Sequence, residues 1–166
     1  MKRLFAPLLL VIALVSCGKE AWDGRVYHAG RASFRAGPIA GSWQKIELEG
    51  AMLAFHDAET GGTLEVYGRC GQDGDDVPLL ALTNHLLIGF TEREVKSQKV
   101  VPLDGREAMH TLVDAKLDGV PMSLSIYVLK KDGCVYDLVY VSPPEKFAAG
   151  LASFDAFAAG FSTVGG

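Results

Sequence analysis

The sequence has few cysteines and no excess of basic residues. Its 166 residues include three cysteines, 16 Lys plus Arg and 20 Asp plus Glu, which gives a net charge of −4 at pH 7. Three cysteines are too few for a disulfide-rich scaffold. An acidic chain without a basic stripe is a poor nucleic-acid binder. The composition therefore predicts no nucleic-acid partner.

Long hydrophobic runs are missing after the N-terminus. No later run reaches the roughly 20 apolar residues that a membrane-spanning helix requires, which excludes a multispan membrane protein. Hydrophobic residues still make up 49% of the chain and charged residues 22%. These fractions are those of an ordinary folded domain and exclude a disordered chain.

Motifs for cofactor binding and catalysis are absent as well. The sequence contains no G-x-G-x-x-G, Walker or G-x-S-x-G motif, and its four histidines have no zinc-ligand spacing. No nucleophile stands beside a recognisable base, so acyl transfer has no candidate residues. We therefore expect no cofactor, no metal and no enzymatic activity.

The N-terminus has the order of an export signal. Met1, Lys2 and Arg3 are followed by an apolar stretch over residues 4–15, which is too short to span a bilayer comfortably. A small residue, Ser16, and then Cys17 end this stretch. A positive start, a short apolar run and a small residue are typical of a signal peptide.

The residues Leu14-Val15-Ser16-Cys17 resemble the lipobox of bacterial lipoproteins. The resemblance implies cleavage between Ser16 and Cys17 and attachment of a diacylglyceryl group to the Cys17 thiol, with the new amino group as a second acylation site. Two or three acyl chains suffice for stable anchoring, so membrane lipid would be a partner through Cys17. Gly18, rather than Asp, resembles the class sent to the outer membrane, facing the periplasm, where the source has two membranes. The alternative is an ordinary secretory signal with Cys17 incidental.

Export changes the expectation for Cys70 and Cys134, because both would then lie in an oxidising compartment. They are 64 positions apart. A disulfide that closes a loop of this length stabilises a fold by roughly 4 kcal/mol in the chain-entropy model. The alternative is two separate buried thiols that act as small hydrophobic residues.

The rest of the chain predicts one domain of class α/β (α+β). We divide the sequence into a signal peptide (1–16), a lipidated tether (17–26) and a single domain (27–166). Alternation and turn residues predict strands, and three- and four-residue apolar spacing predicts helices. The predicted strands are 42–48, 51–56, 63–67, 94–102, 106–117, 122–129 and 134–141, and the predicted helices follow Asp76 and span 145–161.

This order resembles the Mog1/PsbP-like α/β/α sandwich. The residues behind the resemblance are Phe34 with Pro38 and Trp43, the acidic loop before the helix at Asp76, and the apolar stripe of Phe147–Phe161. It implies an antiparallel sheet of about six to seven strands flanked by helices, and members of this fold are mostly non-enzymatic binding or assembly factors. The alternative is a lipocalin-like β-barrel with a terminal helix, which needs at least eight strands.

Asp137 is the most unusual residue for its position. It lies between Val135 and Val139 on an apolar strand face, where a carboxylate must be paired, hydrogen-bonded or shifted in pKa. The simpler interpretation is that Asp137 forms a structural hydrogen bond. The functional interpretation is a speculative pocket that combines Asp137 with His56 and His110.

The remaining candidates are weaker. We expect His56 to form a loop pair with Asp57, His110 to face solvent and His85 to lie partly in the core. Trp22 and Trp43 are candidate interface residues if exposed. Together these features favour a membrane-anchored, non-catalytic binding or assembly module of the cell envelope, with an unknown envelope protein or small molecule as its partner. The alternative is an envelope hydrolase with an unrecognised site.

Overall fold

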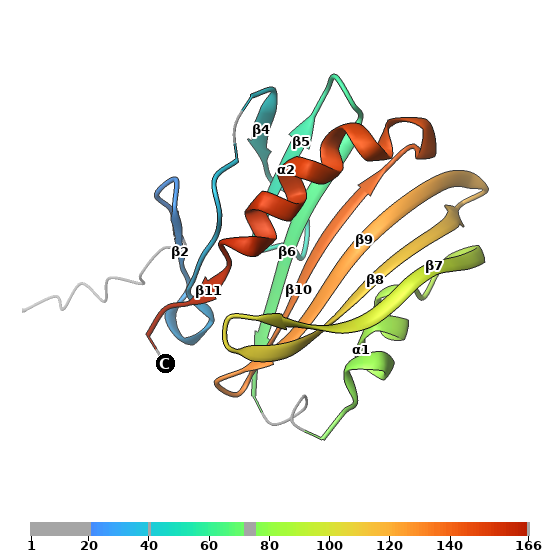
Figure 1. Ribbon diagram of the computed structural model, residues 1–166. Coiled ribbons are helices and arrows are strands. Elements are labelled where there is room, and N and C mark those ends of the chain that lie inside the picture. The colour runs from blue at the N-terminus through green and yellow to red at the C-terminus, as the bar shows by residue number, and fades with distance from the viewer. Residues whose placement is uncertain (1–20, 40, 72–75, 166) are drawn as a thin grey trace, which may run out of the picture.

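The computed structural model describes residues 21–39, 41–71 and 76–165. An antiparallel seven-stranded sheet lies at its centre, in the order β4-β5-β6-β10-β9-β8-β7 (Figure 1). The sheet is open, with β4 and β7 at its edges, so the lipocalin-like alternative is wrong. The strands are β4 Trp43–Ile46, β5 Leu53–Asp57, β6 Gly62–Cys70, β7 Phe90–Leu103, β8 Arg106–Leu117, β9 Val120–Lys131 and β10 Cys134–Ser142.

Three Asp-Gly turns connect β7, β8, β9 and β10 into a meander. In the turns at Asp104, Asp118 and Asp132, the Asp and the following Gly all have positive φ. Two-residue hairpin turns of this kind match the right-handed twist of the flanking strands. These local signals explain why the turns and the strands around them were predicted close to their observed positions.

The two helices cover opposite faces of the sheet, as the sandwich predicts. Even-numbered side chains of β10 face α2 (Phe147–Ala159), and odd-numbered side chains face α1 (Leu79–Leu86). Two separate apolar cores result, because successive strand residues point to opposite faces. We call these faces the α2 face and the α1 face.

A second sheet of very short strands was not predicted. It contains β1 Ala21–Trp22, β2 Val26–His28, β3 Phe34–Arg35 and β11 Ser162–Thr163, in the order β1-β2-β3-β11. It packs on the α2 face and brings the two ends of the described chain together (Figure 1). Strands of two or three residues show no alternation to detect. Strand β1 thus begins at Ala21, within the segment 17–26 that we expected to be a tether.

Helix α1 begins at Leu79, three residues after Asp76, which the sequence placed just before it. Pro78 is its N-cap, and no side chain donates or accepts a capping hydrogen bond there. Gly89 has a φ of +92°, and Phe90 already belongs to β7.

Short 3-10 turns, η1 Gly30–Ala32 and η3 Pro144–Lys146, complete the described elements. Neither helix in the described ranges has the length and apolar character needed to cross a bilayer.

The predicted disulfide is confirmed. Cys70 and Cys134 are directly opposite each other at the ends of β6 and β10, with 4.0 Å between their Cα atoms. The bond joins two strands that are far apart in sequence but adjacent in the sheet, and it fixes their register at that end.

Candidate binding cavity beneath helix α1

A cavity of about 260 Å³ lies on the α1 face. Its polar lining consists of two side chains of β6, Glu65 and Tyr67. The other lining residues are apolar and come from α1 and four strands: Leu86, Phe90, Leu117, Leu124, Ile126, Val139 and Val141. A mostly apolar cavity with a few convergent polar groups is the usual form of a small-ligand site.

Strand alternation places the polar groups of the cavity on one line. Glu65, Tyr67 and Arg69 are alternate residues of β6 and share the α1 face. On the neighbouring strand, Val139 is opposite Glu65 and Asp137 is opposite Tyr67. Two acids and one Arg thus lie on adjacent strands of the α1 face, where Asp137 is buried, Glu65 is half-buried and Arg69 is exposed.

Glu65 and Tyr67 interact directly. The Tyr67 hydroxyl donates a hydrogen bond to Glu65 Oε2 at 2.7 Å. Burial raises the pKa of Glu65 above its ordinary value, and the hydrogen bond from Tyr67 opposes this shift only in part. Burial and the neighbouring Glu65 also raise the pKa of Tyr67. No Lys, Arg or His among the described residues forms an ion pair with Glu65.

Asp137, by contrast, has a cationic partner. Arg69 Nη1 donates to Asp137 Oδ2 at 2.7 Å. Asp137 is 0% exposed, and its Oδ1 has no hydrogen-bond partner among the described residues. Burial raises the pKa of Asp137, while the hydrogen bond and charge of Arg69 act in the opposite direction. The expectation that this acid must be paired or shifted in pKa is confirmed.

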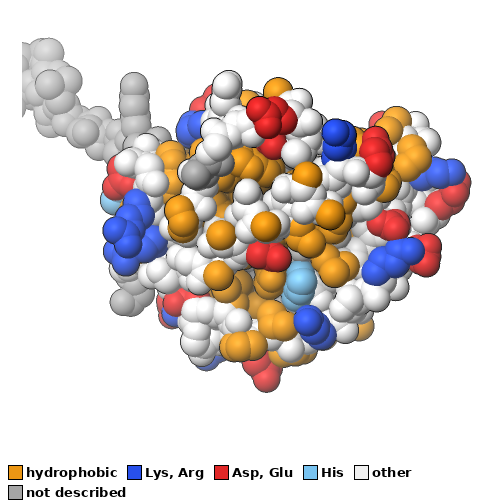
Figure 2. All heavy atoms as spheres, turned by 45° about the horizontal axis from the view of Figure 1, so that its top comes forward, with side chains coloured by type: hydrophobic (Ala, Val, Ile, Leu, Met, Phe, Trp, Pro, Cys, Tyr) orange, Lys and Arg blue, Asp and Glu red, His pale blue; other side chains and the backbone are white. Residues whose placement is uncertain are grey.

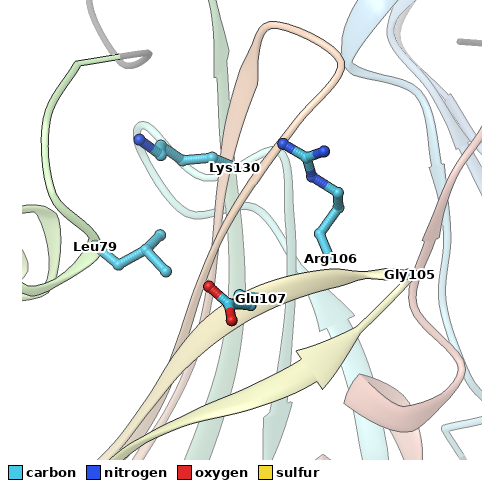
Figure 3. A pocket seen from close by; sticks show the side chains of 5 residues that line it. All are labelled: Leu79, Gly105, Arg106, Glu107 and Lys130. Carbon is cyan, nitrogen blue, oxygen red and sulfur yellow. The ribbon is translucent and has the colours of Figure 1, made fainter.

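Two further hollows on the surface border α1. One, of about 570 Å³, is lined by Arg69 and by residues of α1 and its flanks, among them His85 and Ile88. The other, of about 390 Å³, lies where the β7–β8 turn approaches the start of α1 (Figure 3). There Leu79 is next to the charged side chains of Arg106, Glu107 and Lys130 (Figure 3). This mixed lining suits an apolar ligand less well than the cavity beside Glu65.

The three residues of the speculative pocket do not come together. His110 pairs with Tyr127 of β9 and faces α2, so it lies on the opposite side of the sheet from Asp137. His56 shares the α1 face but pairs with Thr63 of β6, whereas Asp137 pairs with Tyr67. At about 3.3 Å per strand residue, those positions are about 13 Å apart along β6.

His56 and His110 have separate surroundings. The His56 ring is 3.2 Å from the hydroxyl of Thr63, while the next residue, Asp57, caps the following turn from the other face. His110 stacks on Tyr127 at a centroid distance of 4.1 Å and is half-buried. The expectation that His110 faces solvent was therefore wrong, and burial lowers its pKa.

His110 also has a hydroxyl neighbour, Ser125. The His110 Nε2 and Ser125 Oγ atoms are 3.0 Å apart. Ser125 is 0% exposed, and the negative charge of Asp155 on α2 influences the imidazole. The pair resembles part of a catalytic triad in residue type, but its hydroxyl has no exposed surface through which a substrate can approach.

The structure also shows where His85, Trp22 and Trp43 lie. His85 is exposed on α1 and not partly in the core as expected. Trp22 and Trp43 are partly buried and pack edge-on against Phe55 and Tyr140, respectively. Both tryptophans therefore help to build the core on the α2 face.

The surface viewed from above α2 has no single charged region. Hydrophobic side chains gather in its middle, beside an acidic group and a histidine, while acidic and basic side chains are interspersed around the rim (Figure 2). Such a mixed rim does not form the basic stripe that nucleic-acid binding requires.

Comparison with solved structures agrees with this architecture. The chain aligns with cyanobacterial PsbP from Synechocystis at a TM-score of 0.60 and 14% identity, over 91% of this chain and 99% of that protein. The fold is PsbP-like. It also aligns with LpqN of Mycobacterium tuberculosis, described as involved in cell envelope biogenesis, at a TM-score of 0.60 and 12% identity, over 83% of this chain and 88% of LpqN.

A third structure, from Bacteroides thetaiotaomicron, has a TM-score of 0.60 and 13% identity over 87% of this chain. The chain spans only half the length of that protein. The sequence matches no known family model and no curated protein. At these identities the likeness concerns the fold and carries no site residues from one protein to another.

Glu65 and Tyr67 were not among the predicted site residues. Their signal in the sequence is present but weak: both alternate with Leu64 and Val66 in the predicted strand 63–67. This pattern is typical of a solvent-facing polar side. Only the position of α1 over that side shows that the two side chains line a cavity.

Proposed function

We propose that this protein is a lipid-anchored, non-catalytic binding module of the bacterial cell envelope, and that it holds a small apolar ligand beneath α1. The cavity of about 260 Å³ carries this proposal. Dry apolar cavities of about 150 Å³ already bind benzene, and drug-sized ligands occupy about 300–1,000 Å³. The cavity therefore suits an apolar group of intermediate size.

The cellular location rests on the N-terminal sequence. Ser16 and Cys17 lie outside the described residues, so anchoring through Cys17 is a proposal from the lipobox resemblance. The Cys70–Cys134 disulfide supports it, because such bonds persist in oxidising compartments. The shared fold with LpqN, a protein described as involved in cell envelope biogenesis, also supports a location in the cell envelope.

Binding in the cavity is tested with an apolar fluorescent dye and two matched variants. Val141 lines the cavity, so Val141→Phe should fill part of it and abolish saturable binding. Val100 is exposed on β7 and lies outside the cavity lining, so Val100→Phe adds the same group elsewhere and should bind as the wild type does. Equal binding by the two variants, or no saturable binding by the wild type, would contradict the proposal.

Anchoring is tested by Cys17→Ser. The variant should accumulate as an uncleaved precursor and lose labelling by a fatty-acid analogue, because the lipid-accepting thiol is gone. Unchanged labelling would show that Cys17 is not the site.

The hydrolase alternative has one supporting observation, the contact between Ser125 and His110. It is tested with a fluorophosphonate probe that reacts with activated serines. Because Ser125 is fully buried, we expect no labelling. Labelling that disappears in Ser125→Ala would favour the hydrolase instead.

A further inference from the structure

We propose that the ligand of the cavity beneath α1 is a lipophilic amine, whose ammonium group pairs with Glu65 and whose apolar tail lies against the cavity wall. This inference rests on the proposed binding function and adds the chemical class of the ligand.

The charge distribution on the α1 face points to a cation. Two acids, Glu65 and Asp137, lie on adjacent strands beneath the helix, and Arg69 pairs with Asp137. Glu65 has no such partner among the described residues. A carboxylate among apolar groups is costly unless it is paired, and a bound ammonium group would supply the missing charge.

The carboxyl group of Glu65 is also held in place. Oε2 accepts the hydrogen bond from Tyr67, and no other described group donates a hydrogen bond to this carboxyl. One oxygen is thus fixed and the other is left for a ligand. Tyr67 lines the same cavity, and an aromatic ring within about 6 Å of a cation adds further attraction.

The same arrangement disfavours other classes of ligand. A fatty acid would bring a second carboxylate next to Glu65, and like charges in a poorly solvated site repel strongly. A neutral alcohol can accept or donate a hydrogen bond but leaves the charge of Glu65 uncompensated. The apolar wall, formed in part by Ile126 and Val139, fits the tail of all three classes equally.

Titration calorimetry at pH 7 with octylammonium, octanol and octanoate separates these classes, because the three probes share one tail. We expect octylammonium to bind at least ten times more tightly than octanol, and octanoate to bind most weakly. Glu65→Gln should remove the preference for the amine while octanol still binds. Glu107→Gln, which removes an exposed carboxylate outside the cavity lining, should behave as the wild type does.

The outcomes distinguish this inference from the proposed function. If octanol binds the wild type as tightly as octylammonium does, or if Glu65→Gln keeps the preference, the amine assignment is overturned and the apolar cavity stands. If none of the three probes binds saturably, the proposed binding function itself fails.

Discussion

Arg69 donates a hydrogen bond at 2.7 Å to Asp137, a residue with no exposed surface, while its own side chain remains 49% exposed. The pair therefore connects the core of the α1 face to the solvent at the edge of the helix. Removal of one member of such a pair leaves a charge buried without compensation, which is more damaging than removal of both.

We expect Arg69→Met to destabilise the protein by about 1–3 kcal/mol, because a buried group that loses its hydrogen-bond partner carries a desolvation penalty of that order. Urea unfolding at pH 7 measures the change. Combining Arg69→Met with Asp137→Asn should recover much of the loss, since the neutral amide needs no counter-charge. Equal stability of wild type and Arg69→Met would show that the ion pair contributes nothing.

Glu65 should make stability depend on pH. Its pKa in the folded state lies above the ordinary value of 4.5, so the folded protein keeps this proton to higher pH than the unfolded chain does. The stabilising contribution is complete below pH 4.5 and is lost as the pH rises through the folded-state pKa.

Glu65→Gln removes this titration. Relative to the wild type, the variant should therefore gain stability as the pH rises above 4.5 and through the folded-state pKa of Glu65, as measured by urea midpoints at a series of pH values. Glu107→Gln, on the same chain but exposed, should not show this gain. A difference between wild type and Glu65→Gln that stays constant with pH would refute the assignment of a half-buried acid with a raised pKa at this position.

The disulfide should be a large contributor to stability. Replacing both Cys70 and Cys134 with Ala should lower the free energy of unfolding by about 4 kcal/mol, because the open chain regains the entropy of a long loop. Reduction of the wild type with dithiothreitol should give a loss of similar size in the same urea titration. If reduction leaves the midpoint unchanged, the bond is not present in the folded protein.

Local signals were sufficient to predict the meander and the terminal helix. Asp-Gly pairs mark the turns, and alternation marks the strands between them, so β8 over Arg106–Leu117 was predicted with its observed bounds. The small sheet could not be predicted in this way. Its strands are too short to have a period, and they form because β3 and β11, from opposite ends of the chain, meet beside α2.

The candidate site was only partly predictable for a related reason. The sequence showed that Asp137 needs a partner but did not show that this partner is Arg69. The pairing depends on the strand register, which places Tyr67 opposite Asp137 and Arg69 two residues further along β6. The cavity could not be predicted because its wall combines residues of α1 and several strands that are far apart in the sequence. His110 was misjudged because Tyr127, on the neighbouring strand, covers its ring.

The central claim is that ligand binding occurs on the α1 face, and methyl-resolved NMR during titration with octylammonium tests it most directly. The account predicts saturable shifts for Leu86, Leu124 and Ile126, which line the cavity. Leu53 and Leu64, buried on the α2 face, should not move. Shifts centred on Leu53 and Leu64, or no saturable shifts in either group, would contradict it.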